Sequence, residues 1–590
     1  MPIASGSLEE PPQITMSRLP LDDLGQHELI LRVVRAGDRF CYRYALDGIE
    51  HHVAPILKVR QGERFSVRLV NELRGPAKGA TMTASALPAC MPRPMMPAKS
   101  TAFVGYLNHT MYARTMDMPD IDVNMHFHGF QGPPQQENIF LSTLSTPAHA
   151  CEYDVTIPRA QPPGTYYYHP HAHGMADDEV AGGLSGMWIV EPATPQIPPS
   201  DEHAVIISYR VPYVLNNDFL PHFGALARAG AARIASLKPM PAASYDPFNP
   251  PPWPSAMPIR QGSVALHEFC GSRPGVLSAV DGVDAPATLT VPAGEPQLLR
   301  VLNATSDTVE FLRVRDASGK DRPMQIVGRD GVPVGGDFGH PLSRFIAMRQ
   351  ATLVPTGRAD VLLTLAPGDV LTFYSAGHCQ GPGDEFALKT DLLTVRAGAP
   401  SAAPATVASL PLQQTQSPAA QLLRFARSHP QLVRRRAITY TEYLVPGPKG
   451  HGLSDQYYIT QTSLKNFHEQ PFRPVYAKGA RTPNPDIVVK QGSIEEWYLY
   501  NATLETHSFH IHQMDFVAED AKPGPAMLDT TIVPFGKLLP NKANPDYPLI
   551  VPSLTRVLLD FRHVPRGTFV FHCHMLFHED HGMMATIRVE

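Results

Sequence analysis

The segment QGSIEEWYLYNAT, residues 491–503, is the third copy of a pattern that occurs three times in the chain. The earlier copies are QGERFSVRLVNEL, which starts at Gln61, and AGEPQLLRVLNAT, which starts at Ala293. In all three a glycine precedes an asparagine by nine positions, and polar and apolar residues roughly alternate between them. Such alternation is typical of a strand with one buried face. The identical spacing argues against a chance similarity among β segments.

A second segment also recurs three times. It reads PPGTYYYHPH from Pro162, APGDVLTFYS from Ala366 and PRGTFVFHCH from Pro565. A glycine followed by an aromatic and β-branched run indicates a turn that leads into a strand. Three copies of a strand-rich unit predict an all-β protein of three Greek-key β-sandwich domains. We expect these at residues 20–195, 200–398 and 432–590, with an Ala/Pro/Ser/Gln-rich linker at 399–431.

The composition agrees with a loop-rich β protein and excludes several classes. The chain has 590 residues, which is too long for one core, and its 61 prolines are interspersed with apolar sequence. A net charge of −5 gives no support for nucleic-acid binding, and no apolar run approaches a membrane span. The N-terminus lacks the basic start and apolar run of a secretory signal, so the protein is cytosolic or the chain is a mature form.

Histidine clusters occur in the first and third copies and are missing from the second. On a strand, residues i and i+2 point to the same side, so each H-x-H offers two imidazoles about 6–7 Å apart along the strand. A single H-x-H is a weak signal, but four clusters on two facing domains predict a shared metal cluster. The clusters are HFHG (His126, His128), HPHAHG (His169, His171, His173), HSFHIH (His507, His510, His512) and HCHMLFH (His572, His574, His578).

The segment FHCHMLFHEDHGMM, residues 571–584, places a cysteine between two of these histidines. In an extended chain His572 and His574 share one side and Cys573 faces the other, so Cys573 serves a second metal. With His507, His578 and Met583 it forms a set of two imidazoles, a thiolate and a weak thioether, which is the ligand set of blue copper. The chain would then connect a single copper to a histidine-bound cluster.

These motifs closely resemble those of the multicopper oxidases, which include laccases, bilirubin oxidases and cuprous oxidases. The resemblance covers nearly the whole chain and includes LDTTIVPF from Leu528. It implies cupredoxin-like domains and four copper ions, one of type 1, one of type 2 and a type 3 pair. The implied ligands are His507, Cys573, His578 and axial Met583 for type 1, His126 and His510 for type 2, and His128, His169, His171, His512, His572 and His574 for type 3.

The chain departs from the family pattern near the first motif. Phe127 stands where the family usually has tryptophan, and Glu137 stands where it often has an aspartate. The resemblance implies one-electron oxidation of a donor at type 1 copper and reduction of O2 to water at the cluster, which consumes protons. We expect Glu137 and Glu579 to relay them. The alternative is that both carboxylates only orient histidines.

Other residues near the motifs receive structural predictions. His173 and His581 match no ligand position, and we expect them to be neighbours of the site or loop residues. Met584 is expected to pack. If Cys573 binds copper, five of the six cysteines remain, which permits at most two disulfides and is equally compatible with none. Met583 as the axial ligand indicates a low to medium reduction potential.

The electron donor is left open by the sequence. Phenols and aromatic amines are the default donors of such an enzyme, with bilirubin-like compounds or metal ions as further options. The segment 81–125 suggests an alternative, a cuprous oxidase for copper detoxification, because thioethers suit Cu(I). Adaptable apolar packing is the simpler interpretation. The methionines concerned are Met82, Met91, Met95, Met96, Met111, Met116, Met118 and Met125.

More distant functions are a copper nitrite reductase and an electron-transfer copper protein. An electron-transfer protein would need only the type 1 set, and a nitrite reductase would not need the paired H-x-H motifs. We expect O2 and a small-molecule or metal-ion donor as partners, with no nucleic acid and no membrane span. The family is mostly exported, which favours the periplasm or the medium over the cytoplasm.

Overall fold

The structure is a computed structural model of the whole chain. No helix in the part described is long and apolar enough to cross a membrane. The description covers residues 6–22, 25–36, 39–73, 91–92, 121–142, 150–192, 201–209, 257–258, 278–334, 345–381, 386–387, 389–400, 418–446, 453–461, 475–478, 480–503, 505–539 and 549–590.

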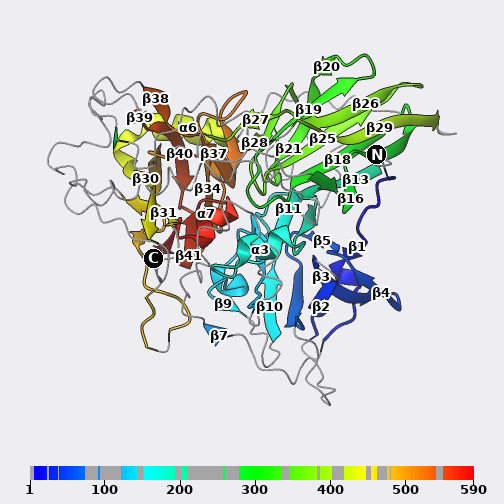
Figure 1. Ribbon diagram of the computed structural model, residues 1–590. Helices are drawn as coiled ribbons and strands as arrows, with labels where there is room; N and C mark the ends of the chain where they lie inside the picture. The colour runs from blue at the N-terminus through cyan, green and yellow to red at the C-terminus, as the bar shows by residue number, and fades with distance from the viewer. Residues whose placement is uncertain are drawn as a thin grey trace.

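Two five-stranded sheets form the first sandwich, shown in blue and cyan in Figure 1. One has the order β1-β5-β12-β11-β8 and the other β10-β6-β2-β3-β4. Leu31 and Val67 of one sheet and Val59 and Trp188 of the other share one buried core. The strands are β1 (Gln13–Thr15), β2 (His27–Ala36), β3 (Arg39–Leu46), β4 (Ile49–His52), β5 (Ile56–Arg60), β6 (Arg64–Asn71), β8 (His126–His128), β10 (Ala150–Thr156), β11 (Gly164–His169) and β12 (Gly186–Glu191).

The second sandwich pairs an eight-stranded sheet, β16-β15-β13-β18-β25-β21-β22 with β23 on β21, with a six-stranded sheet, β17-β29-β26-β19-β20 with β24 on β19. The strands are β13 (Asp201–Tyr209), β15 (Ser278–Val280), β16 (Val283–Asp284), β17 (Ala287–Ala293), β18 (Pro296–Asn303), β19 (Glu310–Asp316), β20 (Asp321–Arg322), β21 (Met324–Arg329), β22 (Val332–Pro333), β23 (Ile346–Met348), β24 (Ala351–Leu353), β25 (Arg358–Thr364), β26 (Val370–Ser375) and β29 (Thr390–Pro400).

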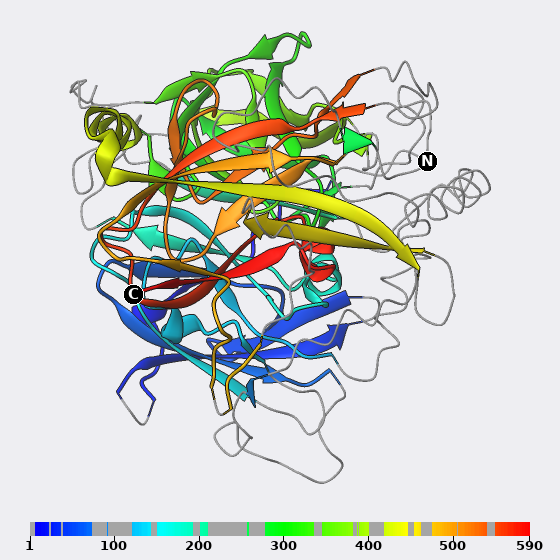
Figure 2. The same cartoon turned by 90° about the vertical axis from the view of Figure 1, so that its left-hand side faces the viewer.

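The third sandwich consists of the sheets β31-β30-β33-β40-β35-β36 and β32-β42-β41-β34-β37. Its long strand β30 is the yellow strand that crosses the front of Figure 2. The strands are β30 (Val433–Pro446), β31 (Leu453–Gln461), β32 (Ile487–Val489), β33 (Ile494–Asn501), β34 (His507–Ile511), β35 (Phe516–Ala518), β36 (Ala526–Leu528), β37 (Thr530–Val533), β40 (Ser553–Asp560), β41 (Gly567–His572) and β42 (Met584–Val589).

Short elements connect or flank the sandwiches. The small sheets are β14-β39-β38, β27-β28 and β7-β9. Their strands are β7 (Met91–Pro92), β9 (Leu141–Ser142), β14 (Met257–Pro258), β27 (His378–Cys379), β28 (Phe386–Ala387), β38 (Lys537–Leu539) and β39 (Leu549–Val551). Helix α3 (Ala176–Ala181) lies beside α7 (Leu576–Asp580), which brings the first and third sandwiches together (Figure 1). The 3-10 helices are η1 (Met16–Arg18), η3 (Pro134–Glu137) and η5 (Pro430–Leu432).

The threefold repeat has a direct structural counterpart. Strands β6, β18 and β33 each pair parallel with the first long strand of their sandwich and antiparallel with a later one. The glycine before each strand has a positive φ, 81° at Gly62, 82° at Gly294 and 93° at Gly492, which favours glycine in the turn. The asparagine that ends each strand is buried and donates its side-chain amide to backbone carbonyls. Turn geometry and a buried hydrogen bond thus explain the fixed spacing.

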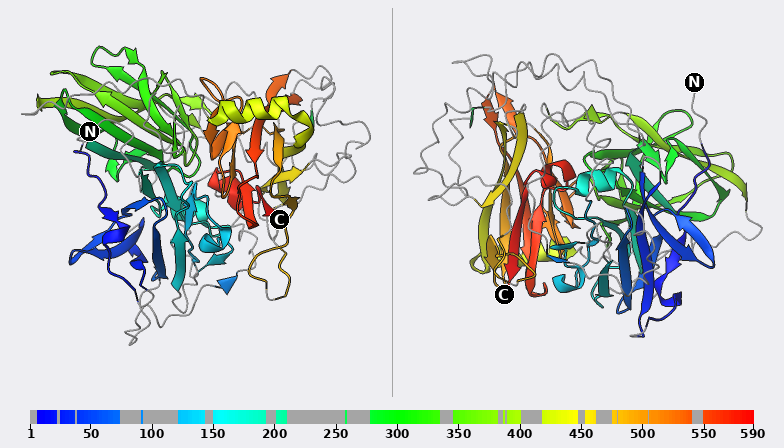
Figure 3. Two further views of the ribbon diagram at one scale, coloured as in Figure 1. Left: turned by 180° about the vertical axis from the view of Figure 1, so that it is seen from behind. Right: turned by 60° about the horizontal axis from the view of Figure 1, so that its bottom comes forward.

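Part of the predicted linker is helical. Helix α6 (Pro418–Ser428) buries Leu422 and Leu423 against Val517 and Leu558 of the third sandwich. Figure 3 (left) shows this helix lying along that sandwich. The predicted all-β fold of β-sandwiches is confirmed, and the predicted domain limits of 20–195, 200–398 and 432–590 stay a prediction.

The cysteines fall into two states within the described part of the chain. Cys151 on β10 is disulfide-bonded. Cys41 and Cys573 are buried free thiols. Cys573 therefore keeps the free sulfur that a copper ligand requires.

Glu310 in the second sandwich makes stability depend on pH. Burial raises the pKa of Glu310 to about 7 from 4.5, although a hydrogen bond with Ser375 opposes the shift. Folding is therefore favoured most below pH 4.5 and loses about 3 kcal/mol as the pH rises to 7. We expect Glu310→Gln to flatten this part of the pH profile of thermal unfolding. A profile with an unchanged slope would contradict the assignment.

Candidate metal centre

The histidines of the four motifs meet between the first and third sandwiches. His126 and His128 lie on β8, and His169 ends β11 opposite His126. In the third sandwich His510 on β34 lies opposite His572, which ends β41. His171, His512 and His574 follow directly after these strands. All eight side chains are buried.

These histidines form three groups in which one ring nitrogen from each lies within 4.8 Å of the others. Each group takes residues from both sandwiches. Ligands about 2 Å from a shared metal would be separated by no more than about 4 Å, so the groups have nearly the spacing that a metal requires. The groups are His126, His128 and His510; His128, His169 and His574; and His171, His512 and His572.

The outer nitrogens of the rings are held by acceptors. His126 Nδ1 lies 3.0 Å from Glu137 Oε2, and His510 Nδ1 lies 2.7 Å from the carbonyl oxygen of Asp529. An N–H on the outer nitrogen leaves a lone pair on the inner one. His126 Nε2, His128 Nδ1 and His510 Nε2 are buried without a hydrogen-bond partner in the described structure. A metal ion is the partner that these nitrogens lack.

The electrostatics of the cluster favour neutral rings. Burial, followed by the neighbouring histidines, holds the pKa of His126 and His512 well below the ordinary value. Burial lowers the pKa of His169 to about 3. Since a metal ligand must be the unprotonated imidazole, the environment preserves the ligand form.

A separate group lies within the third sandwich. His507, Cys573 and His578 converge, with Cys573 Sγ 3.7 Å from His507 Nδ1 and 3.6 Å from His578 Nδ1. Strand β41 ends at His572, but the side chains beyond it still alternate in direction. Cys573 therefore faces this group, while His572 and His574 face the cluster. Met583 is buried, and its carbonyl accepts the N–H of Cys573 at 3.0 Å.

Two sequence profiles of the multicopper oxidases match the chain, at residues 110–195 and 452–590. These ranges contain every histidine of the groups above. The chain belongs to the multicopper oxidase family.

Laccases and a bilirubin oxidase are among its relatives. The laccase of Bacillus stratosphericus is 24% identical over 82% of this chain and 83% of its own length. The bilirubin oxidase of Albifimbria verrucaria is 33% identical over 16% of each chain. The fold matches the McoA multicopper oxidase of Aquifex aeolicus with a TM-score of 0.60 over the whole of both chains, at 16% identity. As a multicopper oxidase, the protein is a copper-dependent oxidoreductase that passes electrons from a small-molecule donor to O2.

The two predicted carboxylates both contact the multicopper oxidase cluster. Glu137 Oε2 accepts the backbone N–H of Phe127 at 2.7 Å besides its contact with His126, and Glu137 Oε1 accepts from Gln513. Burial raises the pKa of Glu137 well above the ordinary value, against the hydrogen bonds from Phe127 and Gln513. Glu579 Oε1 lies 3.3 Å from His171 Nδ1, and Glu579 Oε2 lies 2.9 Å from His572 Nδ1.

The other residues predicted to lie near the motifs are His581, His173 and Met584, and each has a contact outside the proposed copper ligand set or beside it. His581 Nδ1 donates to the carbonyl of Phe577 at 2.7 Å, within the turn of α7. The ring of His173 lies edge-on to His171, with 5.6 Å between centroids. Met584 packs against Phe140 and Val570, as expected.

Sequence reasoning missed several polar residues at the site, among them Glu505, Asp529 and Arg358. Glu505 Oε2 lies 3.3 Å from His578 Nε2, and Asp529 Oδ1 lies 3.2 Å from His128 Nε2. Arg358 of the second sandwich pairs with Asp529. The segment LDTTIVPF marked the place of Asp529 in the chain, but no motif pointed to Arg358 or Glu505.

Proposed function

We propose that this chain is a laccase-like oxidase that couples the one-electron oxidation of phenols or aromatic amines to the four-electron reduction of O2 to water. The observation that carries the proposal is the convergence of three histidine groups with a separate His–Cys–His group through the consecutive residues His572, Cys573 and His574. Bound copper would supply one-electron chemistry at the single site and O2 reduction at the cluster.

The ligand assignment follows the groups and the unpaired nitrogens. His126 and His510 would hold type 2 copper, and His507, Cys573 and His578 would hold type 1 copper. The family resemblance adds the buried Met583 to the type 1 set. The type 3 pair would be held by His128, His169 and His574 on one side and by His171, His512 and His572 on the other. These sites account for four copper ions.

The protein keeps the path between the two sites short and rigid. Cys573 is bonded directly to both His572 and His574 in the chain. Ser508 fixes the same segment from the neighbouring strand, since its N–H lies 3.4 Å from Cys573 Sγ and its hydroxyl oxygen accepts the N–H of His574 at 2.7 Å. A rigid path lowers the rearrangement that each electron transfer requires.

Glu137→Gln tests the carboxylate beside type 2 copper. The change keeps the volume but replaces one acceptor oxygen, so we expect turnover to fall about tenfold while the blue absorption persists. Glu310→Gln is the matched control, because Glu310 is a buried glutamate of the second sandwich. A variant that keeps its copper but turns over slowly supports proton relay, whereas loss of type 2 copper supports an orienting role. Unchanged turnover would remove both roles.

The donor assignment rests on the laccase relatives rather than on the methionine-rich segment. In that segment Met125 is buried in the core of the first sandwich, and its N–H donates to the hydroxyl of Tyr153. This placement supports packing for Met125. Met91 forms part of β7, and its side chain lies outside the described residues together with Met82, Met95, Met96, Met111, Met116 and Met118.

The deciding experiment combines metal analysis with oxygen uptake. We expect four copper ions per chain, the visible and EPR signatures of all three copper types, and O2 consumption with a dimethoxyphenol. Faster oxidation of Cu(I), lost on deletion of 81–118, would favour the cuprous oxidase. Nitrite consumption without phenol oxidation would favour a nitrite reductase. A colourless, fully metallated protein would exclude all of these assignments.

We propose export to the periplasm or the medium. The disulfide at Cys151 supports an oxidising compartment. Fractionation of the source cells tests this directly.

A further inference from the structure

A buried arginine of the second sandwich extends into the site between the other two. Arg358 begins β25, and its side chain is 1% exposed. A guanidinium ion without water must be compensated by charge and hydrogen bonds. Such a residue in a sandwich without predicted copper ligands calls for an explanation beyond packing.

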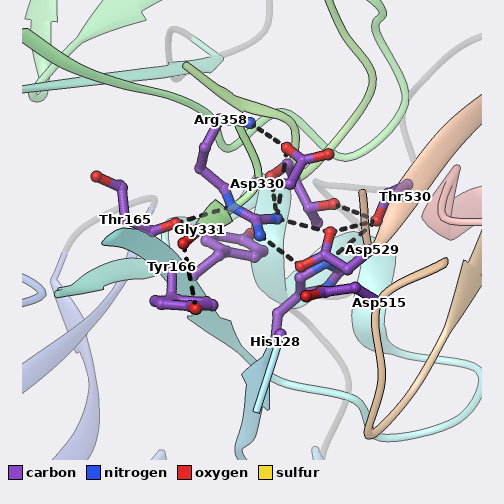
Figure 4. Close-up of polar contacts among 12 residues, drawn as sticks. His128, Thr165, Tyr166, Asp330, Gly331, Arg358, Asp515, Asp529 and Thr530 are labelled. Atoms are coloured by element: carbon purple, nitrogen blue, oxygen red, sulfur yellow. Dashed lines mark hydrogen bonds and ion pairs between the residues drawn. The ribbon is translucent and has the colours of Figure 1, made fainter. Parts of the chain in front are cut away.

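Hydrogen-bond partners from all three sandwiches compensate the buried charge of Arg358 (Figure 4). Arg358 Nη1 donates to Asp529 Oδ1 at 3.0 Å, and Nη2 donates to Asp529 Oδ2. Arg358 Nε donates to the carbonyl of Thr165 in the first sandwich at 3.2 Å, and Nη1 donates to the carbonyl of Thr356 at 2.8 Å. The two-pronged pairing fixes the orientation of the Asp529 carboxylate as well as its position.

Asp529 and Thr530 in turn hold two histidines of the cluster. Asp529 Oδ1 lies 3.2 Å from His128 Nε2, and the Asp529 carbonyl accepts from His510 Nδ1 at 2.7 Å. Thr530 Oγ1 lies 3.2 Å from both of these ring nitrogens. The dipeptide Asp529–Thr530 therefore contacts the outer ring nitrogen of one histidine from the first sandwich and one from the third.

The carboxylate has little freedom to move by itself. Gly129, which follows His128, has a φ of 85°, and a Cβ built there would lie 2.8 Å from Asp529 Oδ2 and 2.6 Å from the ring of Tyr166. The backbone after His128 is thus packed against the same carboxylate that Arg358 grips.

We propose that Arg358 is a positioning residue for the trinuclear copper site, which acts through Asp529 on His128. An acceptor held at Nε2 keeps the proton on that nitrogen, so the lone pair of Nδ1 faces the cluster. The second sandwich then contributes to the metal site without supplying a ligand. This inference rests on the proposed copper assignment.

Arg300 provides a matched control in the same sandwich. It is also buried, and its Nη1 donates to Thr165 Oγ1 at 3.0 Å. Its carboxylate partners are Glu202 and Asp360, and none of its contacts in the described structure is with a histidine of the cluster. Loss of Arg300 disturbs the same junction without reaching Asp529.

The test compares Arg358→Met, Arg358→Lys and Arg300→Met as copper-loaded holoenzymes. Methionine is chosen because Arg358 lines a cavity of about 210 Å³ between the second and third sandwiches, which a smaller residue would enlarge. We expect Arg358→Met to lose the near-ultraviolet absorption of the type 3 pair, to gain EPR-visible copper and to lose turnover about tenfold, with the blue absorption kept. Arg358→Lys should be intermediate, and Arg300→Met should match the wild type.

Two results would overturn the inference. One is an Arg358→Met enzyme whose type 3 signature equals that of Arg300→Met. The other is an intact type 3 signature in Asp529→Asn, which carries the test if Arg358→Met does not fold. A wild-type enzyme without type 1 and type 3 signatures would instead refute the proposed function, and this is seen before any variant is made.

Discussion

Cys573→Ser is expected to abolish the blue absorption and to reduce O2 consumption to background. Serine has nearly the same volume, so the buried segment should keep its fold, but a hydroxyl is neither a thiolate nor a soft ligand. Cys573 Sγ lies 3.7 Å from His507 Nδ1 and 3.6 Å from His578 Nδ1, and the other proposed sulfur ligand, Met583, offers a thioether and no thiolate. The cluster should still show its type 3 absorption, because its histidines remain.

Cys41→Ser is the matched control for this experiment. Cys41 is the other buried free thiol of the described chain and lies on β3 of the first sandwich. It should keep both the colour and the activity. Oxygen uptake by a colourless Cys573→Ser enzyme would show that electrons reach the cluster by another route, and the proposed path would be wrong.

Glu579→Gln is expected to lower turnover about 100-fold with the blue absorption unchanged. The effect should exceed that of Glu137→Gln because one buried carboxylate contacts two histidines of the same group, His171 and His572. An amide offers one acceptor oxygen where the carboxylate offers two, so one of the two rings loses its contact with an acceptor oxygen of residue 579.

The measurements that check this prediction are turnover, copper content and the type 3 absorption. Loss of absorption together with turnover indicates that Glu579 orients the rings. Loss of turnover alone indicates proton delivery. Turnover within twofold of the Glu310→Gln control would exclude both roles.

The parts of the fold that a local pattern encodes could be predicted from the sequence. The spacing from Gly492 to Asn501 reflects a turn at one end of a strand and a buried side-chain amide at the other. The two counterparts have the same origin, so the repeat can be recognised without knowledge of the packing. The alternation of His572, Cys573 and His574 likewise depends only on extended backbone, and it persists beyond the end of β41.

Contacts between segments that are far apart in the sequence produce no local sequence pattern, so they could not be predicted. Arg358 and Asp529 are 171 positions apart, and nothing in the residues around Arg358 distinguishes it from a surface arginine. Helix α6 was hidden for a different reason. Its buried residues Ala419, Leu422, Leu423 and Ala426 follow helical spacing, but the surrounding Ala/Pro/Ser/Gln composition favoured a linker.

The distribution of the groups has a consequence for maturation. The His507–Cys573–His578 group lies wholly within the C-terminal third, so it can accept its ion as soon as that third has folded. Every group of the cluster draws on both ends of the chain, so those sites exist only after the ends have met. Copper bound in the cluster would fasten the two ends together, and the empty protein should be the form that proteases cut first.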